Sequence, residues 1–563
     1  MKRNNEAHFN QVPSLEITRS RFKRDQDIKL TFDAGKLIPF YVDEVLPGDT
    51  FSVDQSAIIR MTTPIFPVMD NAYLDYYYFF VPNRILWEHW KEFMGEVTDA
   101  PWVQTVEYTV PTIKITGTSD TDKLPKEASI LDYMGIPTKF VGAGKSAEIN
   151  ALPIRAYVKI WAEWFRDQNV DNPAINSATD ATVTYTDDAG EDIEKILQQA
   201  YTGGRPLPVN RFHDYFSSSL PSPQRAAEPV RIPLVGNAPI YGFKDSHLKQ
   251  KLVTTDAMNI AYYASMGKAT EGNPVKLSDG RRAKGLSEKL TLSAVHFDGE
   301  TAYMGADLSE VTATTISDLR KAFQVQKYFE EMARGGSRYR EQIYSLFRTR
   351  ISDKTAQIPE YLGGDRVMIN INQVVQTSGT TTESPQGNVA AVSVTGFGKS
   401  AFTKSFEEHG WVIGVCCVRH DHTYQQGIER MWSRKNKLDF YFPVFANLGE
   451  QAVLKKELYA TAEESDEQAF GYQEAWSEYR MKPNRVCGLF RSNANGTLDS
   501  WHYADNYSTV PTLSQEWMKE GKAEIQRTLA IQDEPQFIMD ILVKNTTVRP
   551  MPLYSIPGLV DHH

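Results

Sequence analysis

The most restrictive feature of the sequence is an uncharged run, WVIGVCCV, at residues 411–418. Most of its residues are β-branched or aromatic, which favours a β-strand over a helix. Side chains alternate between the faces of a strand, so Trp411, Ile413 and Val415 point one way, and the apolar residues between them point the other way. An antiparallel sheet usually leaves one face in water. Because both faces of this strand are apolar, we expect a third covering layer, for example another subunit.

Other segments extend the β pattern. An aromatic strand is predicted at residues 73–81 (YLDYYYFFV), and a further strand at 438–445, where Pro443 indicates an edge or a bulge. The spacing of apolar residues predicts helices over 153–169 and 317–334, the second ended by Gly335 and Gly336. β patterning then continues from about residue 365 to 548. The sequence therefore predicts a mainly β chain with helical insertions.

The composition is that of a large globular protein. The chain has 563 residues, of which 41% are hydrophobic and 11% aromatic, enough for a packed core and extensive contact surface. It has no run of 18 apolar residues and no charged-then-apolar leader, so we expect neither a membrane span nor a secretory signal, and synthesis in the cytoplasm. Its three cysteines have no CxxC spacing and are interpreted as buried thiols.

Charge singles out the amino-terminal arm. The chain carries 61 basic and 71 acidic residues, a net charge of −10, so any nucleic-acid contact must be local. The arm contains six basic residues and only two acidic ones, Glu6 and Glu16, and two phenylalanines lie among them. The arm is either a solvated terminus or a phosphate-binding segment whose rings stack on bases. The candidate nucleic-acid-binding residues are Lys2, Arg3, Arg19, Arg21, Lys23, Arg24, Phe9 and Phe22.

His420 and His422 are the candidate metal ligands. Two residues apart in a strand, their imidazoles would face the same side, as shared ligation of a metal requires. With Gly414 six residues earlier, the arrangement resembles the first motif of the cupins, which are metal-binding jelly rolls. A cupin would have a glutamate three or four residues after the second histidine, where this chain has Gln425 and Gln426, followed by Gly427. We therefore favour two histidines at a strand end near an interface, and no cofactor. No GxSxG, HExxH or Rossmann fingerprint gives a specific reason to propose an enzyme.

The middle of the chain changes character. Residues 205–239 are rich in proline and should run extended over a surface. Residues 230–315 are rich in Gly, Ser, Thr, Lys and Asp, with few large apolar side chains, and cannot build much core. A structureless loop of this length is uncommon within one compact domain, so we interpret the segment as a projecting insertion.

Several long blocks resemble a known family almost end to end. The chain looks like the major capsid proteins of the Microviridae, small tailless single-stranded DNA phages, and most of all like their gokushovirus branch. The blocks that carry the resemblance are residues 32–50 (FDAGKLIPFYVDEVLPGDT), 76–88 (YYYFFVPNRILWE), 212–224 (FHDYFSSSLPSPQ), 335–347 (GGSRYREQIYSLF), 358–364 (IPEYLGG) and 410–449.

The resemblance implies an eight-stranded antiparallel jelly roll of the viral capsid type, with long loop and helical insertions. It implies self-assembly into a T=1 icosahedral shell, part of the virion, around a circular single-stranded DNA genome in a bacterial host. Because acidic subunits cannot neutralise DNA, a small basic DNA-binding protein is an expected partner. The implied organisation is an interior-facing basic arm at 1–26, the first part of the jelly roll at 27–229, a threefold protrusion that contacts a host receptor at 230–315, and a helix with the remaining strands and a carboxy-terminal extension at 316–563. The alternative is a cupin-like metal-dependent enzyme using His420 and His422.

Overall fold

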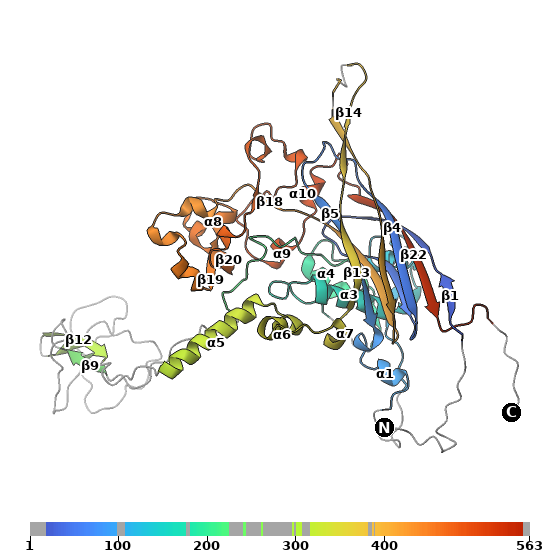
Figure 1. The fold of residues 1–563 in the computed structure, drawn as a ribbon, viewed down its shortest axis with the longest axis horizontal. Helices are drawn as coiled ribbons and strands as arrows, with labels where there is room; N and C mark the ends of the chain where they lie inside the picture. Colours follow the sequence, from blue (N-terminus) through green and yellow to red (C-terminus); the bar gives the residue numbers. More distant parts are fainter. Residues whose placement is uncertain are drawn as a thin grey trace. The chain divides into compact units, whose positions relative to one another are not determined.

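The computed structural model describes residues 18–97, 107–175, 181–224, 240–243, 261–262, 295–297, 300–306, 316–380, 386–387 and 389–555. The chain divides into two compact units, Met1–Pro223 with Glu331–His563, and Gln224–Glu330. The first unit is mainly β, as the sequence predicts, and holds the large sheets seen in Figure 1.

Two antiparallel sheets form the centre of the first unit. The first has the order β1-β22-β4-β16, with β2 also paired to β22, and the second has the order β13-β5-β17-β3. Both β1 and β2 pair with β22, one after the other along it. The strands of the first sheet are β1 (Ser20–Lys23), β2 (Gln26–Phe32), β4 (Thr50–Met61), β16 (Thr395–Ser405) and β22 (Phe537–Arg549). Those of the second are β3 (Ile38–Val45), β5 (Ala72–Pro82), β13 (Glu360–Met368) and β17 (Gly410–His420).

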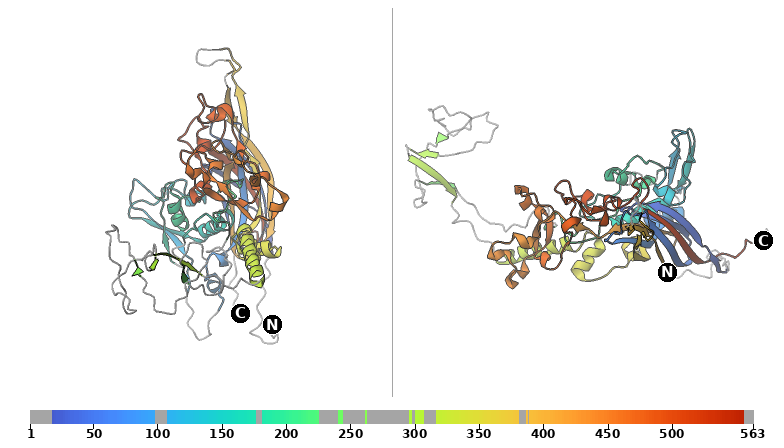
Figure 2. Two further views of the ribbon diagram at one scale, coloured as in Figure 1. Left: turned by 90° about the vertical axis from the view of Figure 1, so that its left-hand side faces the viewer. Right: turned by 90° about the horizontal axis from the view of Figure 1, so that it is seen from above.

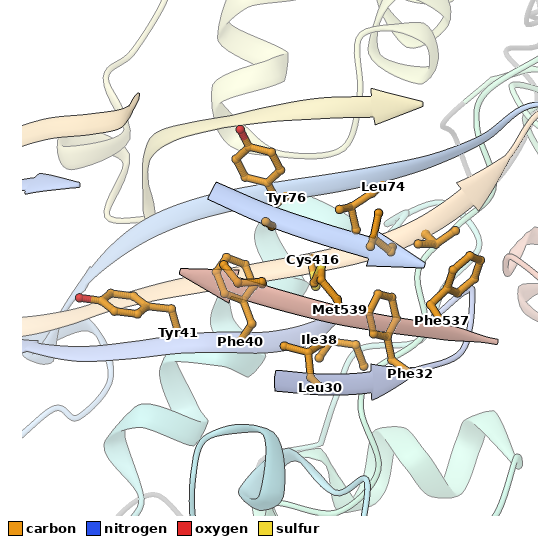
Figure 3. Close-up of a cluster of buried hydrophobic side chains, with 14 of the residues drawn as sticks. Leu30, Phe32, Ile38, Phe40, Tyr41, Leu74, Tyr76, Cys416, Phe537 and Met539 are labelled. Atoms are coloured by element: carbon orange, nitrogen blue, oxygen red, sulfur yellow. The ribbon is translucent and has the colours of Figure 1, made fainter. Parts of the chain in front are cut away.

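The main core lies between these sheets. Alternate residues of β4 and β22 are buried, which is the pattern of a sheet with one face on a core and the other in solvent. Figure 3 shows the two layers meeting, with Phe32 and Phe537 from the first sheet beside side chains of the second, such as Leu74. The Phe32 and Phe537 rings lie 5.8 Å apart, a normal separation for a favourable aromatic pair.

The predicted central strand is confirmed as β17, and both of its faces are buried. Val412, Cys416 and Val418 belong to the core between the sheets, whereas Ile413 and Val415 pack in a second core on the opposite face. Helix α3 (Leu152–Ile160) and its π-helical continuation η3 (Trp161–Phe165) contribute most to that second core. The third layer is therefore part of the same chain, and the suggestion that another subunit covers this strand is wrong. Segments around α3 and α4, drawn in cyan and green, lie together beside the sheets in Figure 2.

Two predicted helices are confirmed, by α3 with η3 and by α5 (Ile316–Arg334). Pro153 occupies the first turn of α3, and Gly336 follows α5 with φ = +95°, a conformation that glycine adopts without strain. The other helices are α1 (Trp90–Phe93), α2 (Ile130–Tyr133), α4 (Ile193–Gln199), α6 (Tyr339–Phe347), α7 (Asp353–Ala356), α8 (Lys455–Leu458), α9 (Gln515–Met518) and α10 (Ala523–Gln526).

The prediction of a strand at residues 438–445 is wrong. The segment forms two 3-10 turns, η6 (Lys437–Asp439) and η7 (Pro443–Asn447), and most of its apolar side chains are exposed. Pro443 lies in the first turn of η7, where its fixed φ and missing N–H are tolerated. Its β-rich composition had suggested a strand, but β propensity is only expressed where a side chain packs on a sheet.

Smaller elements complete the described chain. In the first unit, the pair β14 (Ile371–Val375) and β15 (Val389–Ser393) extends past the end of the sheets in Figure 1. The other small strands of this unit are β6 (Thr112–Thr116), β7 (Ser146–Asn150), β8 (Val183–Thr184), β18 (Thr423–Tyr424), β19 (Glu450–Leu454), β20 (Ala469–Glu474) and β21 (Asn484–Arg485). The second unit contains one sheet, formed by β9 (Ile240–Phe243), β10 (Ala261–Tyr262), β11 (Val295–Phe297) and β12 (Glu300–Ala306).

The cysteines follow their prediction in two cases out of three. Cys416 and Cys417 are buried on opposite faces of β17, and burial raises the pKa of Cys417 to about 12. Cys487 is exposed, so its interpretation as a buried thiol is wrong.

Candidate assembly and nucleic-acid surfaces

The most exposed apolar segment among the described residues joins β18 to β19. Between residues 428 and 448 it contains nine exposed large hydrophobic side chains, with Trp432 exposed by 73%, Leu438 by 70% and Val444 by 80%. The turns η5 (Arg430–Ser433), η6 and η7 hold the chain here, so no strand or helix buries one face of it. Exposed apolar surface gathered in this way is the usual mark of a contact site.

Aromatic rings join this segment and residues 476–479 into one surface, which we call the aromatic patch. Its exposed members are Leu438, Phe440, Tyr441, Phe442, Val444 and Tyr479, and they lie around the half-buried Phe445 and the buried Trp476. Tyr441 lies 5.7 Å from Trp476 and 6.2 Å from Tyr479, measured between ring centroids. The guanidinium of Arg434 stacks 4.4 Å above the Tyr479 ring and bonds the Glu478 carboxylate at 2.8 Å. Ordered aromatic rings with a fixed arginine are typical of the centre of protein interfaces.

Strand β1 carries the described part of the basic arm. Arg21 and Lys23 are exposed, whereas Phe22, between them, is partly buried. Pairing with residues 546–549 of β22 fixes this alternation, and the preceding Arg19 is exposed as well. Three cations thus remain accessible at the start of the first sheet. Lys2, Arg3 and Phe9 lie outside the described residues.

Arg24 has a different role. Its two terminal nitrogens donate to the two carboxylate oxygens of Asp43, both at 2.6 Å, and Asp43 is buried. Burial lowers the pKa of Arg24, but the bonds to Asp43 more than offset this and raise it. Arg24 is therefore engaged in a bidentate ion pair that joins the amino-terminal strands to β3.

The two predicted histidines do meet, as expected, and two carboxylates join them. His420 and His422 are buried, with ring centroids 4.3 Å apart. His422 Nδ1 is 2.9 Å from Asp505 Oδ1, and His422 Nε2 is 3.2 Å from Glu520 Oε2. Glu520 Oε1 also contacts His420 Nδ1. We call these four residues the His–carboxylate cluster.

Electrostatics in the His–carboxylate cluster are dominated by the carboxylates. Burial disfavours a charged imidazole, but Asp505 and Glu520 outweigh it and raise the pKa of His422 to about 10. Burial likewise opposes the charge of Asp505, but His422 and Arg211 hold the pKa of Asp505 far below its usual range. Asp505 Oδ2 accepts from Arg211 Nη1 at 3.0 Å and from Tyr507 at 2.6 Å. No pattern in the sequence indicated these partners, because the carboxylates lie 83 to 100 residues after the histidines.

Comparison with known proteins identifies the family. The sequence matches the model of the capsid protein (F protein) family over residues 10–559. It is 38% identical to capsid protein VP1 of Chlamydia phage 1, covering 98% of this chain and 97% of the relative. It is 38% identical to VP1 of Bdellovibrio phage phiMH2K (99% and 98% covered) and 36% identical to VP1 of Spiroplasma virus 4 (98% and 97% covered). The resemblance seen in the sequence is confirmed, and this chain belongs to the capsid protein (F protein) family.

Proposed function

We propose that copies of this major capsid protein close into a T=1 icosahedral shell around a circular single-stranded DNA genome. The observation that carries the proposal is the aromatic patch, because so many exposed rings on an otherwise charged chain need a partner. The partner that a capsid protein always meets is a second copy of itself. Closed symmetry then buries the same patch on every subunit.

The strand order supports the finer description as a jelly roll. If β1 and β2 are counted as one interrupted strand, the eight strands in chain order form sheets 1-8-3-6 and 5-4-7-2. Most hydrogen-bonded neighbours are thus distant in sequence, and each sheet draws strands from both halves of the chain. This interleaving is what two Greek keys wrapped into a double sheet produce.

The protein is structural and not an enzyme, and the cupin-like enzyme suggested by His420 and His422 has no support. Both histidines are closed in by protein atoms. Among the described residues, no helix has the length and apolar character to cross a membrane.

Imaging of purified particles tests assembly directly. Negative-stain or cryogenic electron microscopy of the expressed protein should show uniform icosahedral particles whose symmetry fits T=1. If the protein remains a homogeneous small oligomer under all conditions in which related capsid proteins assemble, the proposed shell is contradicted. Particles of larger triangulation number would contradict T=1 alone.

We also propose that the exposed cations of β1 contact the packaged DNA from the inner surface. Arg19, Arg21 and Lys23 have no carboxylate partner in a described ion pair, so their charge is available to phosphate. With a net charge of −10 per chain, most neutralisation falls to a separate small basic protein. Phe22 and the undescribed Lys2, Arg3 and Phe9 are further candidates for this contact.

Substitution separates this DNA contact from folding. Arg21→Gln combined with Lys23→Gln should lower the DNA content per particle and leave the thermal stability of empty shells unchanged. The contrasting variant Arg24→Gln should lower stability, because it leaves the buried Asp43 unpaired. DNA content equal to wild type in the double variant would refute the contact.

We further propose that residues 230–315 form a surface protrusion used in host attachment. The range of the compact unit Gln224–Glu330 includes the whole predicted insertion, and this supports the proposal. Replacing 230–315 with a short Gly/Ser linker should preserve particles but abolish adsorption to host cells. Unimpaired adsorption of such particles would refute an attachment role.

A further inference from the structure

The His–carboxylate cluster brings three metal-binding side chains together in a site closed to solvent. Donor atoms of His420, His422 and Asp505 all lie within 4.8 Å of one another, and Glu520 contacts both imidazoles. We propose that this cluster is a structural site for one divalent transition-metal ion, with zinc the best fit.

The donor set suits zinc by type, with His420, His422 and Asp505 as three protein ligands. Glu520 bonds His422 through Nε2, whereas Asp505 bonds it through Nδ1, so Glu520 holds the imidazoles in place and is not a ligand of the same ion. Structural zinc sites take four ligands, and imidazole nitrogens and carboxylate oxygens bind at about 2.0–2.2 Å. Two ligands at such distances from a tetrahedral ion lie roughly 3.5 Å apart, so the present spacing needs only small movements to close on a metal. A set without thiolate and with two imidazoles suits zinc or neighbouring metals better than calcium.

The surroundings of His420 point to a missing ligand. Its side chain is fully buried, yet within the described structure neither ring nitrogen makes an aligned hydrogen bond. Nδ1 only contacts Glu520 Oε1, and Nε2 has no hydrogen-bond partner there. A buried polar group left unsatisfied costs about 1–3 kcal/mol. Coordination of an ion through one of these nitrogens would remove that cost.

Charge balance also leaves room for a cation. Two buried carboxylates, Asp505 and Glu520, contact the imidazoles, and Arg211 is the one guanidinium bonded to them in the described structure. A bound cation would offset the negative charge that Arg211 leaves.

The surroundings hold the cluster in place as the outer sphere of a metal site does. Arg211 and Tyr507 both bond Asp505 Oδ2, which leaves Oδ1 facing His422. Glu520 Oε1 accepts the backbone N–H of His420 at 3.2 Å. Fixed carboxylates and imidazoles of this kind orient metal ligands and raise affinity.

The location suggests what the metal does. His420 ends β17, whereas Asp505 and Glu520 belong to the segment that leads to β22, the last strand of the first sheet. An ion would therefore tie the end of β17 to the segment that precedes β22, and its binding energy would add to folding stability. Because every donor is buried, no open position remains for a substrate.

Metal analysis of purified particles is the test. Particles prepared without a metal-affinity step and dialysed against metal-free buffer are analysed by inductively coupled plasma mass spectrometry. We expect about one zinc or related ion per chain in the wild type and in the control His213→Gln, whose histidine is exposed, and a loss of at least about tenfold in His420→Gln.

A second measurement uses only wild-type protein, in case His420→Gln does not fold. Removal of metal with dipicolinate should lower the melting temperature, and added zinc chloride should restore it, because the ion binds the folded state alone. The site is refuted if wild-type particles carry no stoichiometric transition metal and zinc leaves their melting temperature unchanged. Equal metal content in wild type and His420→Gln would also overturn it, since the ion would then be bound elsewhere.

Discussion

The aromatic patch gives the sharpest prediction, because most of its side chains are exposed in the subunit. Leu438 is 70% exposed and Val444 80% exposed, so replacing both with serine removes apolar surface that folding does not use. Exposed substitutions of this kind change stability by no more than about 0.5 kcal/mol. The subunit should therefore fold normally, and the whole effect should fall on assembly.

The size of that effect follows from the exposed area. Fully burying a leucine or valine side chain contributes about 1.5–3 kcal/mol, so burying the exposed parts of Leu438 and Val444 contributes about 1.5–2 kcal/mol each. A loss of about 3.5 kcal/mol per contact weakens that contact a few hundredfold, since about 1.4 kcal/mol is tenfold.

Light scattering measures the result. The concentration at which shells form should rise at least about tenfold in Leu438→Ser/Val444→Ser, while near-ultraviolet circular dichroism and the subunit melting curve stay as in wild type. The matched control is Lys435→Ser, an exposed residue of the same segment whose truncation removes a charged side chain and no apolar one. Wild-type assembly by the double variant would show that the patch faces solvent in the particle.

Three predictions concern the subunit itself and use chemical denaturation of dissociated protein. Ile413→Ala empties space in the core under α3 and should cost about 2–5 kcal/mol; a loss below about 1 kcal/mol would mean that this layer is not packed. Asp75→Asn leaves Arg419 without its buried carboxylate and should cost about 3–5 kcal/mol, so an unchanged free energy of unfolding would contradict the ion pair. Burial raises the pKa of Glu457, so its folded-state contribution is present at low pH and lost as pH rises through that pKa; Glu457→Gln should therefore gain stability relative to wild type as pH rises from about 4 to 8, and a loss of stability relative to wild type over that range would refute the sign.

The sequence predicted β17 because alternation is a local property. Eight consecutive apolar residues determine that both faces of the strand are dry, and the structure confirms it. What covers the second face could not be predicted, since Ile154, Tyr157 and Trp161 come from a helix some 250 residues earlier in the chain. A periodic pattern indicates that something covers an apolar face, but only the tertiary structure identifies the element that does so.

The His–carboxylate cluster shows the same limit at a polar site. The spacing of His420 and His422 placed both rings together, and this is what the structure contains. Asp505 and Glu520 follow short irregular segments and α9, where no strand or helix period relates them to the histidines. Contacts between residues this distant depend on the path of the whole chain, so no motif could have revealed them.

The excess of apolar surface expected from the sequence exists, and its densest part lies on the turns between residues 428 and 448. The two cores on opposite faces of β17 close with side chains of the same chain, as Val412 and Ile413 demonstrate. The subunit can therefore fold before it assembles, and its association resembles the docking of preformed surfaces more than the completion of a core. Assembly and folding should then respond independently to mutation, which is why serine at Leu438 and alanine at Ile413 are expected to affect different measurements.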